Sequence, residues 1–264
     1  MKRFEIDPEN YNDEYYLGEC DGYHEFLSDN LGGAPARLKT IWDVADVTAG
    51  MVVLDAGCGR GEILRKCRQD KVFCIGIDYS KYALRLAKNF ITKDTIVTEH
   101  NSVYLIQSDL ESIPLAANIF DRVIMSDVVE HIEPERFIRV LKEIRRVMKV
   151  NGELVIHTMP NLWYYRYGYP IFRFIESLRG NKLPKNPRSR FKYSHFHVNE
   201  QDPRRLKSAL QSAGFQSKVW LYDYRKYSMY PLVMRIGMRA ITKLPLIKLI
   251  FCDDIFAIGI KTHD

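Results

Sequence analysis

Three acidic residues and a run of glycines are placed where a nucleoside could bind. The stretch LDAGCGRGE, residues 54–62, contains three glycines after an apolar run. Glycine lets the backbone approach a ligand closely because no Cβ intervenes. Asp55 lies in this stretch, and Asp78 and Asp109 stand at the ends of two later apolar runs. Carboxylates accept strong hydrogen bonds from hydroxyl and cationic groups, so the pattern predicts a ligand that carries such groups.

The glycine spacing differs from that of dinucleotide-binding proteins. It is GxGxG rather than GxGxxG, and Asp55 precedes Gly57 by two residues, where a carboxylate would oppose a pyrophosphate. No lysine of the P-loop type accompanies the glycines. These features disfavour ATP and NAD, and with NAD a dehydrogenase. S-adenosylmethionine fits better, because it has a ribose diol, a sulfonium and an ammonium group but no phosphate.

The apolar pattern predicts alternating strands and helices that would bring these residues to one edge of a sheet. Strands are expected at 51–57, 71–80, 103–110, 120 to about 126, 153–160, 217–224 and 254–262, with a turn at Asn151-Gly152 before the fifth. Helices are expected at 62–69, 81–90, 134–149 and 202–215. This alternation predicts an α/β fold, a parallel sheet with helices on both faces. Ligands of such sheets bind at the carboxyl ends of the strands.

Length and cysteine usage narrow the class of protein. A chain of 264 residues predicts one domain, 1–264, with additions. The five cysteines are scattered and form no CxxC pair, so we expect neither a disulfide framework nor a metal site. The sequence has no secretory signal and no apolar run long enough for a membrane span. A cytoplasmic location is therefore expected.

Five stretches, in order, resemble the successive motifs of class I S-adenosylmethionine-dependent methyltransferases of the small-molecule type. They are VVLDAGCGRGE, GIDYS, QSDLESIPL, FDRVIMSDVVEHI and LKEIRRVMKVNGELVIHTMPN, and they cover about residues 45–160. The resemblance implies a Rossmann-like, doubly wound, seven-stranded sheet of order 3-2-1-4-5-7-6. The last strand of this sheet is antiparallel to the others, and helical cap insertions are added to the fold. The resemblance also implies S-adenosyl-L-methionine as cofactor and S-adenosyl-L-homocysteine as product.

The resemblance further implies which residues contact the cofactor. Asp55, Gly57, Cys58 and Gly59 are expected at its methionine part, Asp78 at its ribose hydroxyls, Tyr79, Asp109 and Leu110 at its adenine, and Ser126 near the methyl donor. An N-terminal helical lid, residues 1–44, is expected to fold over the cofactor and to place Tyr16 against it.

Histidines are the candidate catalytic bases, since imidazole titrates near neutral pH. His131 follows the fourth expected strand, close to the methyl site. His195 and His197, in SHFHVN, precede the late helix at the border of the acceptor pocket. Positioning alone could also suffice for a reactive acceptor, so the use of a base stays open.

An acceptor-cap insertion is expected at residues 161–198. Its aromatic side chains can stack on rings, and its arginines can pair with carboxylate or phosphate. The candidate acceptor-binding residues are Trp163, Tyr164, Arg166 and Arg173. Residues 161–193 contain eight lysines and arginines and one acid, which predicts an anionic acceptor.

A second insertion, residues 225–252, is basic and amphipathic. Such a stretch can lie in a membrane interface, or it can pack on the domain or on a second subunit. We therefore expect a protein that is a monomer or homodimer, located in the cytoplasm and peripheral to the inner face of the membrane. An acceptor carried on a lipid, such as a polysaccharide intermediate, would explain both basic segments.

The leading hypothesis is methyl transfer to oxygen of a small or lipid-linked, anionic acceptor. RNA methylation is an alternative that the basic and aromatic segments allow. The motif (Asp/Asn)-Pro-Pro-(Tyr/Phe), typical of enzymes that methylate base amines, is absent after the fourth strand, so nucleic acid is the less favoured partner. A non-catalytic protein that binds S-adenosylmethionine is a further alternative, because a fold alone does not establish activity.

Overall fold

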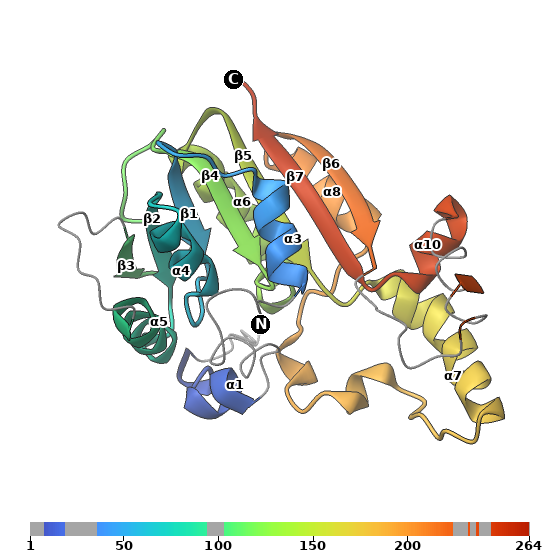
Figure 1. Ribbon diagram of the computed structural model, residues 1–264. Helices are drawn as coiled ribbons and strands as arrows, with labels where there is room; N and C mark the ends of the chain where they lie inside the picture. The colour runs from blue at the N-terminus through green and yellow to red at the C-terminus, as the bar shows by residue number, and fades with distance from the viewer. Residues whose placement is uncertain are drawn as a thin grey trace.

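The computed structural model describes residues 8–18, 36–93, 103–223, 232, 236–237 and 244–263, and its centre is a seven-stranded sheet (Figure 1). The strands are β1 (Val52–Ala56), β2 (Phe73–Asp78), β3 (Val103–Gln107), β4 (Phe120–Ser126), β5 (Met148–Thr158), β6 (Phe215–Tyr222) and β7 (Asp254–Lys261). Their order is β3-β2-β1-β4-β5-β7-β6, and β7 is antiparallel to both of its neighbours. The expected strand order and the antiparallel last strand are confirmed.

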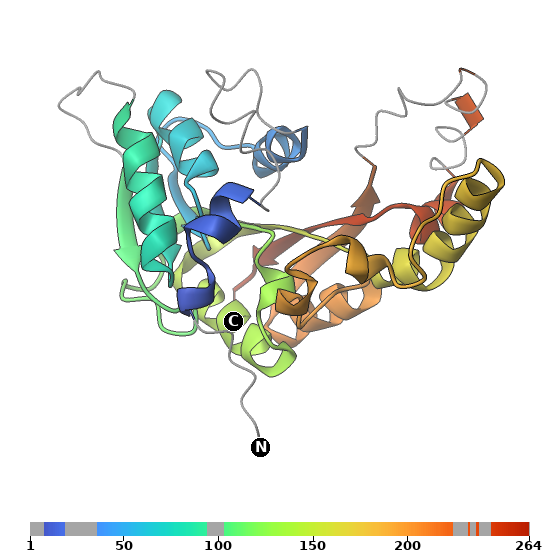
Figure 2. The same ribbon diagram turned by 90° about the horizontal axis from the view of Figure 1, so that it is seen from below.

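Helices cover both faces of this sheet (Figures 1 and 2). One face carries α3 (Ala36–Ala45), α4 (Glu62–Gln69) and α5 (Lys81–Lys93), and the other carries α6 (Pro134–Val147) and α8 (Pro203–Ser212). Shorter elements include α1 (Asp13–Gly18), α7 (Tyr169–Leu178), α10 (Pro245–Phe251) and the 3-10 turns η1 (Pro8–Asn10), η2 (Val129–His131), η4 (Pro187–Arg190) and η5 (Ser194–Phe196). A π-helical turn, η3 (Tyr164–Gly168), leads into α7.

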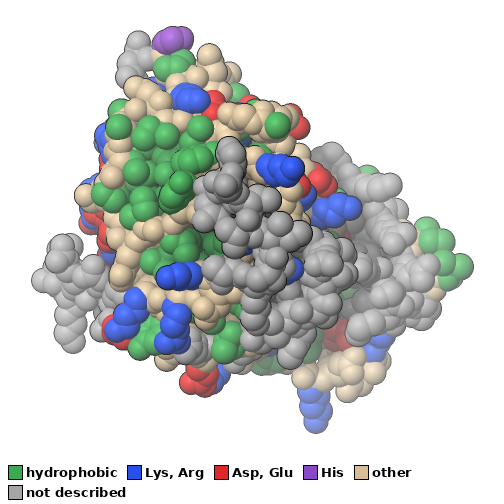
Figure 3. Space-filling model, turned by 60° about the vertical axis from the view of Figure 1, so that its left-hand side comes forward, with side chains coloured by type: hydrophobic (Ala, Val, Ile, Leu, Met, Phe, Trp, Pro, Cys, Tyr) green, Lys and Arg blue, Asp and Glu red, His purple; other side chains and the backbone are tan. Residues whose placement is uncertain are grey.

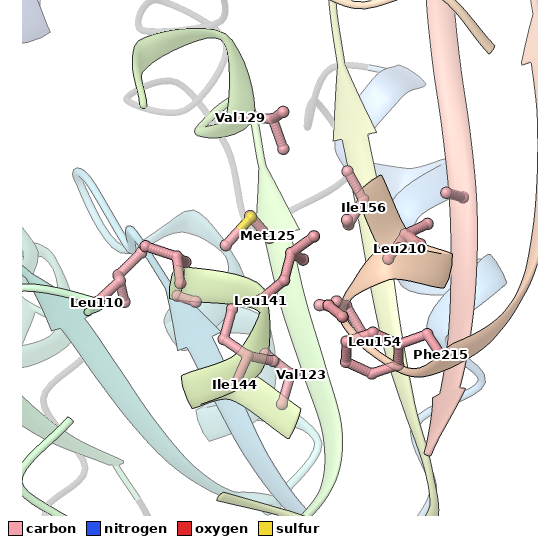
Figure 4. Close-up of a cluster of buried hydrophobic side chains, with 14 of the residues drawn as sticks. Leu110, Val123, Met125, Val129, Leu141, Ile144, Leu154, Ile156, Leu210 and Phe215 are labelled. Carbon is pink, nitrogen blue, oxygen red and sulfur yellow. The ribbon is translucent and has the colours of Figure 1, made fainter. Parts of the chain in front are cut away.

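The core between the sheet and α6 follows from helical periodicity. Phe137, Val140, Leu141 and Ile144 recur at the spacing that puts side chains on one face of a helix, and all four are buried. Figure 4 shows Leu141 and Ile144 beside Val123 and Met125 of β4. This packing fixes the carboxyl end of β4, where the expected catalytic residues begin.

One strand differs from the expectation. We expected a turn at Asn151-Gly152 and a strand from residue 153, but β5 already begins at Met148. Asn151 has a left-handed φ of 64°, and the pairing with β4 changes register between Phe120 and Arg122. The two turn residues therefore form an irregularity within the strand, where extra residues are taken up without ending the pairing.

The two ends of the sheet expose apolar side chains. Figure 3 turns the β3 side of the molecule toward the viewer, and hydrophobic side chains gather there. Phe73 and Tyr104, on β2 and β3, are 41% and 51% exposed, and their ring centroids lie 5.5 Å apart. At the other end, α7 and α10 extend beyond β6 and β7 (Figure 2).

Most of the expected insertion at 225–252 lies outside the described residues. Within it the structure describes residues 232, 236–237 and 244–252, including α10. None of the helices in the described parts of the chain is long and apolar enough to cross a membrane.

Candidate cofactor and acceptor site

A cavity of about 360 Å³ lies at the carboxyl ends of β1, β2 and β4. All ten residues that we expected at the cofactor line this cavity: Tyr16, Asp55, Gly57, Cys58, Gly59, Asp78, Tyr79, Asp109, Leu110 and Ser126. They come from segments that are far apart in the sequence. The parallel sheet brings them together because it aligns the ends of its strands.

The glycine turn after β1 is shaped by steric limits and by hydrogen bonds to β2. Gly57 and Gly59 have left-handed φ values of 78° and 49°. A Cβ at Gly57 would lie 2.5 Å from a methyl carbon of Val128, so no side chain fits there without a shift. The backbone amides of Gly57 and Cys58 both donate to the carbonyl of Ile77, at 2.8 and 3.0 Å. The bare backbone of this turn therefore forms part of the cavity wall.

Asp78 stands at the end of β2 with both carboxylate oxygens already in use. Oδ2 accepts from the amide of Gly59 at 3.0 Å, and Oδ1 accepts from the amide of Ser80 at 2.9 Å. A carboxylate has about four lone-pair sites, so these contacts do not exhaust its capacity to accept hydrogen bonds. Burial raises the pKa of Asp78 to about 6, although the backbone hydrogen bonds act in the opposite direction. The carboxylate is thus held rigidly and can accept from a diol.

Buried carboxyl groups are concentrated around the glycine turn. Asp55 is 3% exposed, and its pKa is raised by burial first and then by Glu62 and Asp78. Burial and the two aspartates also raise the pKa of the Cys58 thiol. Buried carboxylates that repel one another are stabilised by an opposite charge. This part of the cavity therefore favours a cationic group.

Asp109, beyond β3, makes local and long-range contacts. Its Oδ1 accepts from the amide of Glu111 at 2.9 Å, and Oδ2 pairs with the guanidinium of Arg136 on α6. Arg136 also pairs with Glu111 and lines the cavity. The sequence analysis did not single out Arg136, because its partners are distant in sequence.

The described part of the expected lid, residues 8–18, lies against the cavity. Arg60 donates to the carbonyl of Tyr16, and Ser80 donates to the carbonyl of Tyr11, both at 2.8 Å. Tyr11, Tyr15 and Tyr16 all contribute to the lining. The Tyr11 ring packs on Phe196 of η5, with centroids 5.0 Å apart. The rest of the lid falls outside the described residues, except α3.

Two of the three candidate histidines line the cavity. The Tyr11 hydroxyl lies 3.1 Å from Nδ1 of His131, and the rings of His131 and His197 have centroids 5.0 Å apart. Burial, and then His197, lower the pKa of His131 to about 3, so its imidazole is neutral near pH 7. His195 is exposed, lies outside the lining and packs its ring on Phe196.

Glu130, next to His131, is a buried carboxyl that the sequence analysis did not single out. It is 1% exposed and accepts from the Thr158 hydroxyl at 2.7 Å. Burial, and then Asp127, raise its pKa to about 8. The Glu-His pair was visible in the sequence, but the burial of Glu130 depends on β5, which supplies Thr158.

A row of charged side chains lies where β4 and β5 end and β7 begins. His157 is fully buried between Asp127, at 2.7 Å, and Asp254, at 3.2 Å. Burial opposes the charged imidazole, but the two aspartates outweigh it and raise the pKa of His157 to about 9. Arg37 lies 3.2 Å from Asp127, whose pKa falls below its usual range although burial acts to raise it. Asp127 also lines the cavity, so this row of charged side chains connects the site to the sheet.

The four candidate acceptor-binding residues lie outside the lining. Trp163 packs under Arg204, and Tyr164 is buried against Tyr165 and Tyr169. Arg166 is exposed and lies over the ring of Tyr167, while Arg173 is half-buried on α7. Their neighbour Tyr165 lines the cavity instead, together with Phe191 and Tyr193 from the same cap. The aromatic composition of the cap predicted such a wall, but the π-helical turn decides which rings face the cavity.

Comparisons with known proteins agree with this geometry. Residues 54–156 match the family model described as a methyltransferase domain. The chain is 29% identical over 148 residues to malonyl-[acyl-carrier protein] O-methyltransferase of Buchnera aphidicola, over 56% of this chain and 53% of that protein. It is 30% identical over 135 residues to the mitochondrial ubiquinone biosynthesis O-methyltransferase of Rattus norvegicus, over 51% of this chain and 37% of that protein.

A solved structure shows the same fold. The S-adenosylmethionine-dependent methyltransferase from Archaeoglobus fulgidus superposes with a TM-score of 0.53 at 23% identity, over 86% of this chain and 92% of that one. The chain spans about half, or less, of the length of the two curated relatives. The matched domain, the sheet order and the cavity at the glycine turn all agree with a class I S-adenosylmethionine-dependent methyltransferase.

Proposed function

We propose that this protein transfers a methyl group from S-adenosylmethionine to an oxygen atom of a small or lipid-linked acceptor. One observation carries the proposal: a single cavity is lined both by the ten expected cofactor residues and by Glu130, His131, His197 and several tyrosines. A methyl donor and an acceptor must share one cavity for the transfer to occur.

The residues of the cavity fit the cofactor. Asp78 would accept from the ribose hydroxyls through the lone pairs that its two backbone contacts leave free. Asp55 adds a buried carboxyl group beside the glycine turn, and the sulfonium and ammonium groups would favour its ionised form. When bound, S-adenosylmethionine supplies a methyl group on a cationic sulfur, which is a good leaving group.

The acceptor end of the cavity suits a hydroxyl group. The neutral imidazole of His131 and the Tyr11 hydroxyl are joined by a hydrogen bond, and both can orient an acceptor oxygen. The names of the two curated relatives describe O-methyltransferases, which supports oxygen as the atom methylated here.

The surface of α7 supports an acceptor carried on a lipid. Ile171, Phe174, Ile175 and Leu178 recur at helical spacing and are 44%, 64%, 40% and 74% exposed. Arg166, Lys182 and Lys185 are exposed nearby in the sequence. An apolar helix face with a cationic border matches an anionic membrane surface. Arg166 and Arg173, which lie outside the cavity, would then contact anionic groups of the lipid or of the acceptor.

Calorimetric titration with S-adenosylmethionine tests the cofactor assignment. The wild type should bind S-adenosylmethionine, and Asp78→Asn should weaken the affinity about 10- to 100-fold. The NH2 group of the asparagine would face backbone amides that also donate, and the one remaining oxygen could not accept hydrogen bonds from both ribose hydroxyls. Asp70→Asn is the matched control, since Asp70 is an exposed partner of Lys66 on α4 and should leave affinity unchanged. Binding of NADH by the wild type without binding of S-adenosylmethionine would refute the proposal.

Acceptor screening then tests the reaction itself. Release of S-adenosylhomocysteine should be measured with hydroxyl-bearing acceptors, free and lipid-linked, and with amine acceptors of similar size. Methylation of an amine without methylation of any hydroxyl would contradict transfer to oxygen.

A further inference from the structure

Three side chains at the acceptor end of the cavity form a cluster of metal-ligand type. Among the described residues, one ligand atom each from Glu130, His131 and His197 lie within 4.8 Å of one another. All three residues line the cavity. The sequence alone indicated no metal site, because His197 is brought to the Glu-His pair only by the fold.

Hydrogen bonds hold the two segments of this cluster together. The amide of Asn199 donates to the carbonyl of Glu130 at 3.0 Å, and the Asn199 side chain donates to the carbonyl of Val129 at 3.3 Å. Asn199 is two residues after His197, so these bonds fix the backbone that carries the second histidine. The cluster is therefore built by backbone contacts and does not depend on a chance approach of mobile side chains.

Neighbouring groups orient two of the three candidate ligands. One oxygen of Glu130, Oε2, accepts from the Thr158 hydroxyl at 2.7 Å, which leaves Oε1 for another partner. Nδ1 of His131 lies 3.1 Å from the Tyr11 hydroxyl. Metal-binding histidines and carboxylates commonly have such outer partners, which fix the orientation of the ligand.

The donor set determines which cation would fit. Two imidazole nitrogens and one carboxylate oxygen are typical of divalent transition metals, and three protein ligands leave open coordination positions. Mg²⁺ and Ca²⁺ prefer oxygen ligands, so they fit less well.

We propose that Glu130, His131 and His197 bind a divalent transition-metal cation, with the open positions directed to the acceptor oxygen. The role of the cation rests on the proposed function: it would orient an acceptor hydroxyl and lower its pKa.

Titration of the full chain with Co²⁺, after treatment with a chelator, tests the site. We expect one equivalent to bind and to give visible absorption bands, whose intensity reports the coordination geometry. Glu130→Gln and His197→Gln should each weaken Co²⁺ binding by more than the roughly 10- to 100-fold that loss of an outer partner costs. His195→Gln is the matched control, since His195 is exposed, lies two residues from His197 and should leave Co²⁺ affinity unchanged.

Two results would overturn the inference. One is the absence of saturable Co²⁺ binding by the wild type, and the other is equal Co²⁺ affinity in His197→Gln and His195→Gln. S-adenosylmethionine affinity and the melting temperature of each variant show whether it is folded. Binding of S-adenosylmethionine without Co²⁺ would refute the metal site alone, whereas binding of Co²⁺ without S-adenosylmethionine would refute the proposed function alone.

Discussion

Asp78 combines a structural role with the binding role proposed above. Its carboxylate holds the glycine turn through Gly59, and burial raises its pKa to about 6. Protonation would remove the charge that strengthens hydrogen bonds from a ribose diol. If Asp78 binds the ribose as proposed, cofactor affinity should therefore fall in mild acid.

The pH dependence of S-adenosylmethionine binding should show this effect. At pH 5, one unit below the pKa of about 6, roughly one Asp78 in ten is ionised in the free protein, so affinity should fall about tenfold from its value above pH 7. Asp78→Asn cannot lose a proton at this position and should lack the tenfold change. Calorimetry across this range measures it, and identical pH profiles for the two proteins would contradict the assignment.

At the same scale, the sequence predicted which residues line the cavity better for the expected cofactor residues than for the expected acceptor residues. The cofactor residues follow strands directly, so local pattern determines their position. Trp163 and Arg166 lie in the cap, where the π-helical turn and the packing on Arg204 decide which side chain faces the cavity. Arg136 and Asp127 depend on partners from other elements, which no local spacing reveals.

At the scale of elements, His157 ties three strand ends together. It lies at the end of β5 and contacts Asp127 beyond β4 and Asp254 at the start of β7. When folding raises the pKa of a histidine, its protonated form stabilises the folded protein. This stabilisation is fully present below the pKa of the unfolded state and is lost as the pH rises through the pKa of the folded state. Here the window runs from about 6.5 to about 9.

Urea unfolding should therefore show a loss of stability across this window. The wild type should lose on the order of 3 kcal/mol of unfolding free energy between pH 6.5 and 9 through this group. His157→Gln should be less stable at pH 6.5 and should lack this part of the decline. Glu130, whose pKa is raised to about 8, contributes a separate decline in both proteins. Parallel stability curves for the two proteins would show that His157 is not charged in the folded state.

The strand order could be predicted from the sequence, whereas this tie between strands could not. Each strand carries its own apolar run, and the resemblance to a known family supplied the order. Asn151-Gly152 has the composition of a turn, but β5 pairs with β4 both before and after these two residues and so stays one strand. Tertiary pairing thus overrode a strong local signal.

At the scale of the whole molecule, α7 and the strands β2 and β3 lie at opposite ends of the sheet (Figure 1), and both ends expose apolar side chains. The sequence around α7 is strongly basic, since residues 161–193 contain eight lysines and arginines and one acid. We therefore expect the α7 end to contact anionic lipid.

Flotation with anionic vesicles at low salt measures this contact. The wild type should bind, and Phe174→Glu and Leu178→Glu should each weaken binding by at least about tenfold, since burial of such a side chain contributes about 1.5–3 kcal/mol. Tyr104→Glu makes the same kind of change at the β3 end and should leave binding intact. Added salt should weaken binding as it screens the basic border. Equal binding by all variants, or none by the wild type, would contradict a membrane role for α7.

The anchoring of residues 8–18 affects how the limits of this protein should be drawn. The family-model match covers residues 54–156, yet Arg60 and Ser80 bind the carbonyls of Tyr16 and Tyr11 at the cavity. A chain trimmed to the matched region would keep the glycine turn but lose residues 8–18 and the cap residues, such as Tyr165 and Tyr193, that line the same cavity. The region that the family model recognises is therefore smaller than the region that encloses the cavity, and a shortened form of the protein should keep the larger one.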